Sequence, residues 1–207
     1  MLFRSEGLEV TRVNQVWVSD ITYYRLADRF YYLTFIMDLF TRKIVGRHCS
    51  PSLRTEHTTI PVLTMAINCR KGINLTGLIL HSDGGGQYYS KEFISITSKA
   101  GIVNSMCESV YENPHAERLN GTIKNQYIIP YQPITYQALI KAQIKSVRMY
   151  NEQKPHRALR GLTPDEFESR ILSSQSPVES ENNFASYFPL STVTPQKKKP
   201  INELVVT

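Results

Sequence analysis

Three acidic residues occupy positions where a carboxylate can do chemistry. Asp20 lies within a run of aromatic and β-branched residues, where an unpaired carboxylate costs free energy. Asp83 comes three positions after the end of a short apolar run, residues 78–80, and precedes three successive glycines. Glu117 stands in the first turn of a helix that an Asn-Pro pair opens. Oxygen donors from two strand positions and one helix can converge on a hard divalent cation, so these residues predict a metal-dependent site.

Each carboxylate also has a structural explanation. An aspartate within a strand is often a hydrogen-bonded structural group. The glycines after Asp83 are typical of a plain turn. Glu117 would stabilise its helix through the helix dipole even without a catalytic role. Asp38 ends the second expected strand and competes with Asp20 for the same role. The residue pattern alone leaves these alternatives open.

The helix that carries Glu117 has a polar face with a spacing suited to DNA chemistry. Glu117, Asn120, Gly121 and Lys124 recur at i, i+3, i+4 and i+7. Lys124 therefore lies about 10 Å along the axis from Glu117, where it could grip a phosphate beside a metal-bound phosphodiester. A solvated polar face is the alternative. The neighbouring face is expected to be buried and consists of Ala116, Leu119, Ile123 and Tyr127.

The positive charge is concentrated after Glu117. Residues 118–160 contain eight Lys and Arg residues and a single acidic residue, Glu152, whereas the formal charge of the whole chain is +6. This imbalance favours a surface that faces phosphates over a merely solvated one. The basic residues are Arg118, Lys124, Lys141, Lys145, Arg148, Lys154, Arg157 and Arg160.

Composition excludes several other classes of protein. The chain has 207 residues, of which 41% are hydrophobic and 20% charged, as in ordinary globular proteins. No apolar run approaches the ~18–20 residues that span a bilayer, and the first ten residues lack the apolar segment of a signal peptide. Three widely spaced cysteines match neither a disulfide framework nor a paired zinc motif. We therefore expect a reduced, cytoplasmic setting without a membrane.

The hydrophobic pattern predicts one α/β domain that positions these residues. Three strands joined by short turns come first, at residues 16–24, 30–37 and 43–49, and indicate an antiparallel meander. Helices and strands then alternate: a helix over 55–69, a buried strand over 78–80, a helix over 90–100 and a strand over 102–106. Helices over 114–127 and 135–151 follow, and a capping box of Thr163 and Glu166 starts a last short helix. We expect a short N-terminal extension (1–12), the core (13–172) and a polar, flexible tail (173–207).

Five segments in order carry a resemblance to a known family. Together they resemble the integrase catalytic core of insertion-sequence DDE transposases, specifically OrfB, the second-reading-frame product of the third insertion-sequence family, a relative of retroviral integrases. The resemblance covers roughly residues 13–168. The segments are NQVWVSDITY (14–23), MDLFTRKIVG (37–46), HSDGGGQY (81–88), NPHAERLNGTIK (113–124), and YN (150–151) with KPHRAL (154–159).

The resemblance implies a fold, a reaction and a set of residues. The fold is ribonuclease-H-like, with a mixed five-stranded sheet whose first three strands are antiparallel, flanked by helices. Asp20, Asp83 and Glu117 become the catalytic and metal-binding triad, which decides against Asp38, and Lys124 becomes a contact to the DNA. The implied cofactors are two Mg²⁺ or Mn²⁺ ions. The implied partners are double-stranded DNA, further copies of the chain assembled on it, and a helix-turn-helix protein or domain.

Other site residues follow from their places beside this triad. Asn120 and the basic residues of positions 118–160 are expected to contact DNA, and His81 and His115 flank the carboxylates, where they could position phosphate or water. Between Asp83 and Glu117 lie 33 residues, fewer than is usual in the family, and we expect the shortening to fall in a loop over 107–113.

One departure from the family keeps two other functions open. Only about 13 residues precede the core, whereas full-length family members carry helix-turn-helix segments there. A nuclease of the ribonuclease-H-like class would use the same carboxylates without joining strands. A catalytically silent remnant that only binds DNA or assembles is the third possibility.

Overall fold

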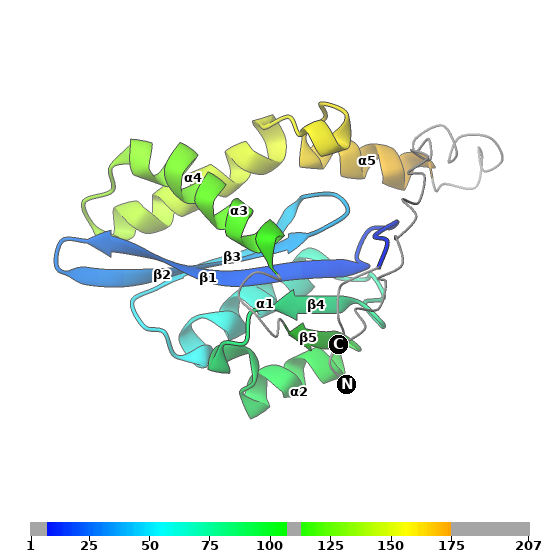
Figure 1. The fold of residues 1–207 in the computed structure, drawn as a ribbon, viewed down its shortest axis with the longest axis horizontal. Coiled ribbons are helices and arrows are strands. Elements are labelled where there is room, and N and C mark those ends of the chain that lie inside the picture. The colour runs from blue at the N-terminus through cyan, green and yellow to red at the C-terminus, as the bar shows by residue number, and fades with distance from the viewer. Residues whose placement is uncertain (1–7, 107–112, 175–207) are drawn as a thin grey trace, which may run out of the picture. The chain divides into compact units, whose positions relative to one another are not determined.

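A five-stranded mixed sheet organises the chain. The structure is a computed structural model that describes residues 8–106 and 113–174. The strand order is β3-β2-β1-β4-β5 (Figure 1). The strands are β1 (Val16–Leu26), β2 (Arg29–Asp38), β3 (Ile44–Ser50), β4 (Ile79–Ser82) and β5 (Val103–Met106). The first three strands pair antiparallel, and β4 and β5 add to β1 in parallel, as the sequence predicts.

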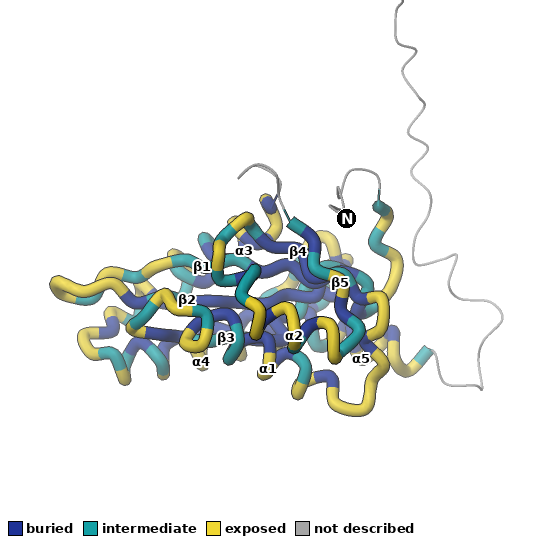
Figure 2. Tube along the Cα trace, turned by 90° about the horizontal axis from the view of Figure 1, so that it is seen from below, coloured by how far each residue is buried: buried dark blue, intermediate teal, exposed yellow. Residues whose placement is uncertain are grey.

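Helices cover both faces of the sheet. Figure 1 shows α1 (Thr59–Cys69) and α2 (Lys91–Lys99) on one side, and α3 (Pro114–Thr122) and α4 (Tyr136–Gln153) on the other. Alternate residues of β1 serve the two sides, because side chains of a strand alternate between faces. Trp17 packs with Leu63 of α1 and Phe93 of α2, whereas Val18 packs with Leu119 of α3. The buried stretches in Figure 2 accordingly follow the strands and the inner sides of the helices.

The structure differs from the predicted elements at several boundaries. The helix expected over 114–127 is α-helical only to Thr122 and continues as a π-helix over Ile123–Ile128. Pro130, which has no amide hydrogen to continue the ladder, lies in the 3-10 turn that follows. Likewise the helix expected from residue 55 begins with a 3-10 turn and becomes α1 only at Thr59.

The expected ends of the core can be followed only in part. Leu8 and Val10, within the expected N-terminal extension, pack against the core. The last helix, α5 (Pro164–Ser174), ends past the predicted boundary at residue 172. Residues 107–112 of the loop predicted over 107–113, and residues 175–207 of the tail predicted over 173–207, lie outside the described residues. Among the helices that the structure describes, none is long and apolar enough to cross a membrane.

Asp38, the rival of Asp20, is a structural residue. It is fully buried at the end of β2. Its Oδ1 accepts hydrogen bonds from the backbone amides of Phe40 (2.9 Å) and Thr41 (3.0 Å), and its Oδ2 accepts one from the amide of Asn14 (2.6 Å). Both carboxylate oxygens are therefore committed to the turn after β2 and to the chain entering β1.

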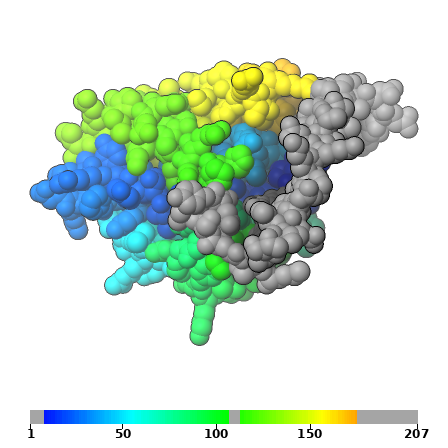
Figure 3. Space-filling model, in the orientation of Figure 1, coloured from blue at the N-terminus to red at the C-terminus, as the bar shows by residue number. Residues whose placement is uncertain are grey.

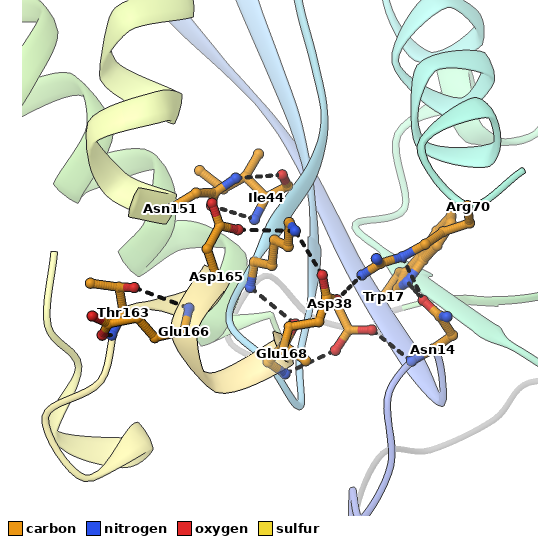
Figure 4. Close-up of polar contacts among 12 residues, drawn as sticks. Asn14, Trp17, Asp38, Ile44, Arg70, Asn151, Thr163, Asp165, Glu166 and Glu168 are labelled. Carbon is orange, nitrogen blue, oxygen red and sulfur yellow. Dashed lines mark hydrogen bonds and ion pairs between the residues drawn. The ribbon is translucent and has the colours of Figure 1, made fainter. Parts of the chain in front are cut away.

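A buried polar network joins α5 to the sheet (Figure 4). Glu168 of α5 is 4% exposed and forms ion pairs with Arg70, through Nη2, and with Lys43, whose Nζ lies 2.7 Å away. The Arg70 side chain also donates from Nε to Oδ1 of Asn14 at 3.0 Å. The network connects the end of α1, the start of β3 and α5, segments far apart in the sequence.

The predicted capping box is present at the start of α5. The amide of Glu166 donates to Oγ1 of Thr163 at 3.2 Å, and the amide of Thr163 donates to Oε2 of Glu166 at 2.9 Å. We expect Thr163→Ala to lower the free energy of unfolding by about 1 kcal/mol, because one amide of the first turn loses its acceptor. Urea unfolding measures this, with the exposed Thr64→Ala on α1 as control. Equal stability of Thr163→Ala and the unmodified chain would contradict the capping role.

Candidate active site

Two of the predicted carboxylates lie at the same end of neighbouring parallel strands. The register pairs Ser19 of β1 with Ser82 of β4, and each is followed directly by an aspartate, Asp20 and Asp83. β4 ends at this point, whereas β1 continues. Both aspartates are partly buried. The carboxyl ends of parallel strands are the usual place for a ligand site in an α/β sheet.

The third carboxylate stands on a helix that is tied to β1. Asn113, the residue before α3, is buried and donates from Nδ2 to the carbonyl of Ser19 at 2.9 Å. Pro114 begins the helix, and Glu117 lies in its first turn with an exposed side chain. The start of α3 is therefore held beside the residue that precedes Asp20.

Asn120 reaches Asp20 directly. Its Nδ2 donates to Oδ2 of Asp20 at 2.8 Å, and only 5% of the residue is exposed. The sequence places Asn120 on the polar face of the helix, and the structure shows that this face turns toward β1 at that position. One turn further on, Nζ of Lys124 lies 3.5 Å from Oγ1 of Thr22 and 5.4 Å from the ring centroid of Tyr23.

The electrostatic environment of Asp20 includes both other carboxylates of the predicted triad. Burial is the largest cause that raises the pKa of Asp20, and the negative charge of Asp83 is the next, so that the pKa rises from 3.8 to about 6. Hydrogen bonds from the amide of Ile21 and from Asn120 lower the pKa, and Glu117 raises it further. Asp20 therefore experiences both other carboxylates.

This convergence of charge is not a closed set of metal ligands. Within residues 8–106 and 113–174, no three Asp, Glu, His or Cys side chains are grouped so that they could hold one metal ion. Of the three predicted carboxylates, Glu117 is exposed, whereas Asp20 and Asp83 are partly buried.

The raised pKa of Asp20 predicts a stability change with a definite pH dependence. A carboxyl whose pKa is higher in the folded state favours folding below its unfolded pKa of 3.8, and this contribution is lost as the pH rises through about 6. We expect Asp20→Asn to raise the free energy of unfolding by about 2–3 kcal/mol at pH 8 and to leave it nearly unchanged at pH 4. Urea unfolding at the two pH values measures this. Asp28→Asn, at an exposed position of the same hairpin, is the control, and a pH-independent effect of Asp20→Asn would contradict the electrostatic coupling.

The two histidines have different surroundings. His81 is 5% exposed, and its Nδ1 lies 3.0 Å from Oγ of Ser105, its partner on β5. His115 is exposed at the start of α3, and its Nδ1 lies 3.0 Å from Nη1 of Arg42. Burial, followed by the charges of Arg42 and Arg118, lowers the pKa of His115. His81 thus belongs to the interior of the sheet, and His115 faces a cationic environment.

The basic residues after Glu117 are mostly at the surface. Lys154 is partly buried and donates to Oε1 of Gln126 at 3.2 Å, and Nζ of Lys145 lies 4.6 Å from the ring centroid of Tyr131. The others are exposed, as a surface for phosphates requires: Arg118, Lys141, Arg148, Arg157 and Arg160.

Known proteins are similar to this chain in sequence. The chain is 31% identical to the insertion element IS600 uncharacterized 31 kDa protein of Shigella sonnei, over 77% of this chain and 59% of that protein. It is 29% identical to transposase InsF for insertion sequence IS3A of Escherichia coli, over 77% of this chain and 56% of that protein. The chain thus spans less than two thirds of the length of these curated relatives.

Solved structures show the same fold. The HTLV-2 integrase catalytic core domain, determined in complex with magnesium, superposes with a TM-score of 0.60 at 23% identity, over 74% of this chain and 95% of that one. A chain of the simian T-cell lymphotropic virus intasome gives a TM-score of 0.65 at 17% identity, over 95% of this chain and 65% of that one. The sheet order and its flanking helices are accordingly those of the ribonuclease-H-like integrase core.

Family models match nearly the whole described region. One model of an integrase core domain matches residues 10–111, and a second model of an integrase core domain matches residues 101–164. The two matches are consecutive and cover the sheet, the three carboxylates and α4. The chain belongs to the integrase core domain family, whose members include insertion-sequence transposases.

Proposed function

We propose that this chain is the catalytic core of a DNA transposase that cleaves and joins DNA strands with the help of divalent metal ions. The observation that carries the proposal is geometric: Asp20 and Asp83 follow the paired residues of two neighbouring parallel strands, and hydrogen bonds from Asn113 and Asn120 hold the helix of Glu117 against β1. Membership of the integrase core domain family supplies the reaction class, phosphoryl transfer on DNA. The chain matches less than two thirds of the length of its curated relatives. We therefore propose, rather than assign, strand cleavage and joining as its reaction.

The donor set fits a hard cation. All three residues offer carboxylate oxygens, which Mg²⁺ and Mn²⁺ prefer. The negative charges of Asp83 and Glu117 contribute, after burial, to the raised pKa of Asp20, as expected of a carboxylate among like charges that a cation would neutralise. We infer that Asp20 with Asp83, and Asp20 with Glu117, would hold two ions. Divalent cations held there would polarise the scissile phosphate and the attacking oxygen.

The protein's own groups prepare this site. Asn120 donates to Oδ2 of Asp20, and the backbone amide of Ile21 donates to Oδ1 at 2.8 Å, so the orientation of the carboxylate is fixed. Glu117, whose side chain is exposed in the first turn of α3, would supply the third carboxylate to the ions. Water, and afterwards a DNA 3′-hydroxyl, supplies the attacking oxygen in an in-line displacement, so no serine, tyrosine or cysteine nucleophile is required.

The exposed basic residues supply a surface for the DNA backbone. Lys124, which is partly buried, stands on the helical segment that continues from Glu117 and Asn120, and its Nζ lies 3.5 Å from Oγ1 of Thr22, two positions after Asp20. Further exposed basic residues lie on α4 and in the segment after it, and they enlarge the positively charged surface: Lys141, Lys145, Arg148, Arg157 and Arg160. His115 adds a polar group at the start of α3.

Partners beyond DNA follow from the family. The longer relatives leave room for end recognition outside the segment that this chain shares with them, so we infer a separate helix-turn-helix domain or protein. Two ends of an element must be held together for transposition, and we infer at least two copies of the chain on DNA. The reaction would take place in the cytoplasm, where the chromosome is accessible.

Strand joining by the chain itself tests the proposal. The substrate is a labelled duplex with the terminal sequence of the element that encodes the chain and a free 3′-hydroxyl, mixed with a supercoiled plasmid and Mn²⁺. We expect labelled plasmid to form with Mn²⁺ and none to form with EDTA. Cleavage without joining would replace the proposal with a nuclease, and DNA binding without either reaction would replace it with a silent remnant.

Lys124 gives a separate prediction for DNA binding. If its ammonium group contacts a phosphate, Lys124→Ala should lower the affinity uniformly across DNA sequences. It should also reduce the slope of log K against log salt by about 0.9. Fluorescence anisotropy over a salt series measures the slope. Lys99→Ala at the end of α2 removes the same charge elsewhere, and equal slopes for the two variants would contradict the contact.

A further inference from the structure

One part of β1 projects beyond the site. Residues 16–19 of β1 pair with β4, but from Asp20 onward β1 pairs only with β2. Among residues 8–106 and 113–174, the β1 edge of the β1–β2 hairpin thus has no strand paired with it from the proposed metal site onward. In Figure 1 this hairpin extends to the left beyond β4 and β5. In Figure 3 it forms a protruding end of the described part, coloured blue.

Two large aromatic residues are exposed on this hairpin. Tyr23 is 60% exposed and Phe30 is 50% exposed. Tyr23 pairs with Tyr32, and Phe30 pairs with Arg25, so Tyr23 and Phe30 are diagonal neighbours on one face of the hairpin. Their ring centroids lie 5.4 Å apart with the planes at 90°. The rings form one apolar platform rather than two isolated surface residues.

The platform is joined to the proposed site by a cation. Nζ of Lys124 lies 5.4 Å from the centroid of Tyr23 and 3.5 Å from Oγ1 of Thr22. Tyr23 is also only three positions after Asp20 on the same strand, a distance of roughly 10 Å. Side chains alternate along a strand, so Tyr23 and Phe30 lie on the face of the hairpin opposite to that of Asp20 and Thr22, and Lys124 lies at this edge close to both Thr22 and Tyr23.

We infer that the Tyr23–Phe30 platform stacks with an unpaired base at the DNA end, while Lys124 contacts the neighbouring phosphate. This inference rests on the proposed function. Asp20 is partly buried, so a strand at the end of a duplex reaches it more easily when the terminal base pair is open. Every base has an apolar face that can stack on an aromatic ring, and the contact does not depend on base identity. An open terminal base needs such a surface beside the site.

Binding of frayed and blunt DNA tests the platform. The two probes are duplexes that differ only at their last base pair, which is matched in one and mismatched in the other, with 2-aminopurine at the terminal position. They are mixed with the full chain and Ca²⁺. We expect the unmodified chain to bind the frayed duplex about 10-fold more tightly and to quench its fluorescence. Tyr23→Ala and Phe30→Ala should lose the preference and the quenching, and Tyr23→Phe should keep both.

The controls separate this inference from the proposed function. Tyr131→Leu removes a second tyrosine that lies under a lysine, Lys145, and should keep the preference for frayed DNA. If Tyr23→Ala still prefers and quenches the frayed duplex, the platform is wrong while the transposase proposal stands. If the variants instead change the sedimentation of the free chain and not the quenching, the aromatic pair is a contact between copies. If the unmodified chain binds neither duplex, both proposals fail.

Discussion

Asp20→Asn should abolish strand joining, with a fall of at least about 10³-fold, in a protein that remains folded. The neutral amide has the same shape and can accept one of the two hydrogen bonds that the carboxylate receives, from Asn120 or from the amide of Ile21, so the fold is retained. The substitution removes the negative charge of the residue proposed to bind both metal ions. The electrostatic stabilisation that metal-assisted phosphoryl transfer requires is lost with that charge. Labelled product formation with Mn²⁺ measures the change.

The expected loss of activity is opposite in sign to the expected change in stability. Burial and the charge of Asp83 make the ionised form of Asp20 less favourable. Replacing this carboxylate by an amide therefore stabilises the fold near pH 8, whereas it disables the site. Asp28→Asn makes the same chemical change at an exposed position of the hairpin and should leave activity unchanged. An Asp20→Asn protein that joins strands at the rate of Asp28→Asn would contradict the assignment of the site.

Glu168→Gln should cause the largest loss of stability, about 3 kcal/mol in the free energy of unfolding. The glutamine leaves the buried guanidinium of Arg70, which is 5% exposed, without a carboxylate, and it weakens the contact to Lys43. Urea unfolding at pH 7 measures the loss. Glu152→Gln, an exposed residue of α4, is the matched control and should change stability by less than about 0.5 kcal/mol.

The pH dependence of Glu168 gives a second check. Burial raises the pKa of Glu168, but the hydrogen bonds from Arg70 and Lys43 outweigh burial and lower the pKa below its ordinary value of 4.5. The stability that it contributes is therefore present above 4.5 and is lost as the pH falls further. The difference between the unmodified chain and Glu168→Gln should shrink in acid. A difference that stays constant down to pH 3 would contradict the ion-pair explanation.

Much of the fold could be predicted from local patterns. The β-branched and aromatic runs of β1 and β2, the continuous apolar run before Asp83 and the capping box at Thr163 each contain their signal within a few residues. The switch of α3 into a π-helix at Ile123 could not be predicted, because the residues there are compatible with an ordinary α-helix.

The site was predictable to the extent that it follows from strand ends. Asp83 follows a buried strand, and its neighbour across the parallel register is Asp20. The choice between Asp20 and Asp38 needed the structure or the family resemblance, since the donors that satisfy Asp38 include Asn14, which is remote in sequence.

The role of Asn120 was beyond sequence reasoning. Helical spacing places it beside Glu117, but only the packing of α3 on β1 shows that its amide meets Asp20 and not the surface. Exposure of Tyr23 and Phe30 likewise depends on how far β1 outruns β4, a length that the apolar pattern does not encode.

The central claim is that Asp20, Asp83 and Glu117 together hold divalent ions, and anomalous scattering from Mn²⁺ tests it most directly. Crystals of the chain grown with Mn²⁺ are measured at the manganese absorption edge. The account predicts anomalous density between Asp20 and Asp83, with the Glu117 side chain turned toward Asp20, and no such density in crystals of Asp20→Asn. Manganese bound elsewhere, or the same density in the Asp20→Asn crystals, would contradict it.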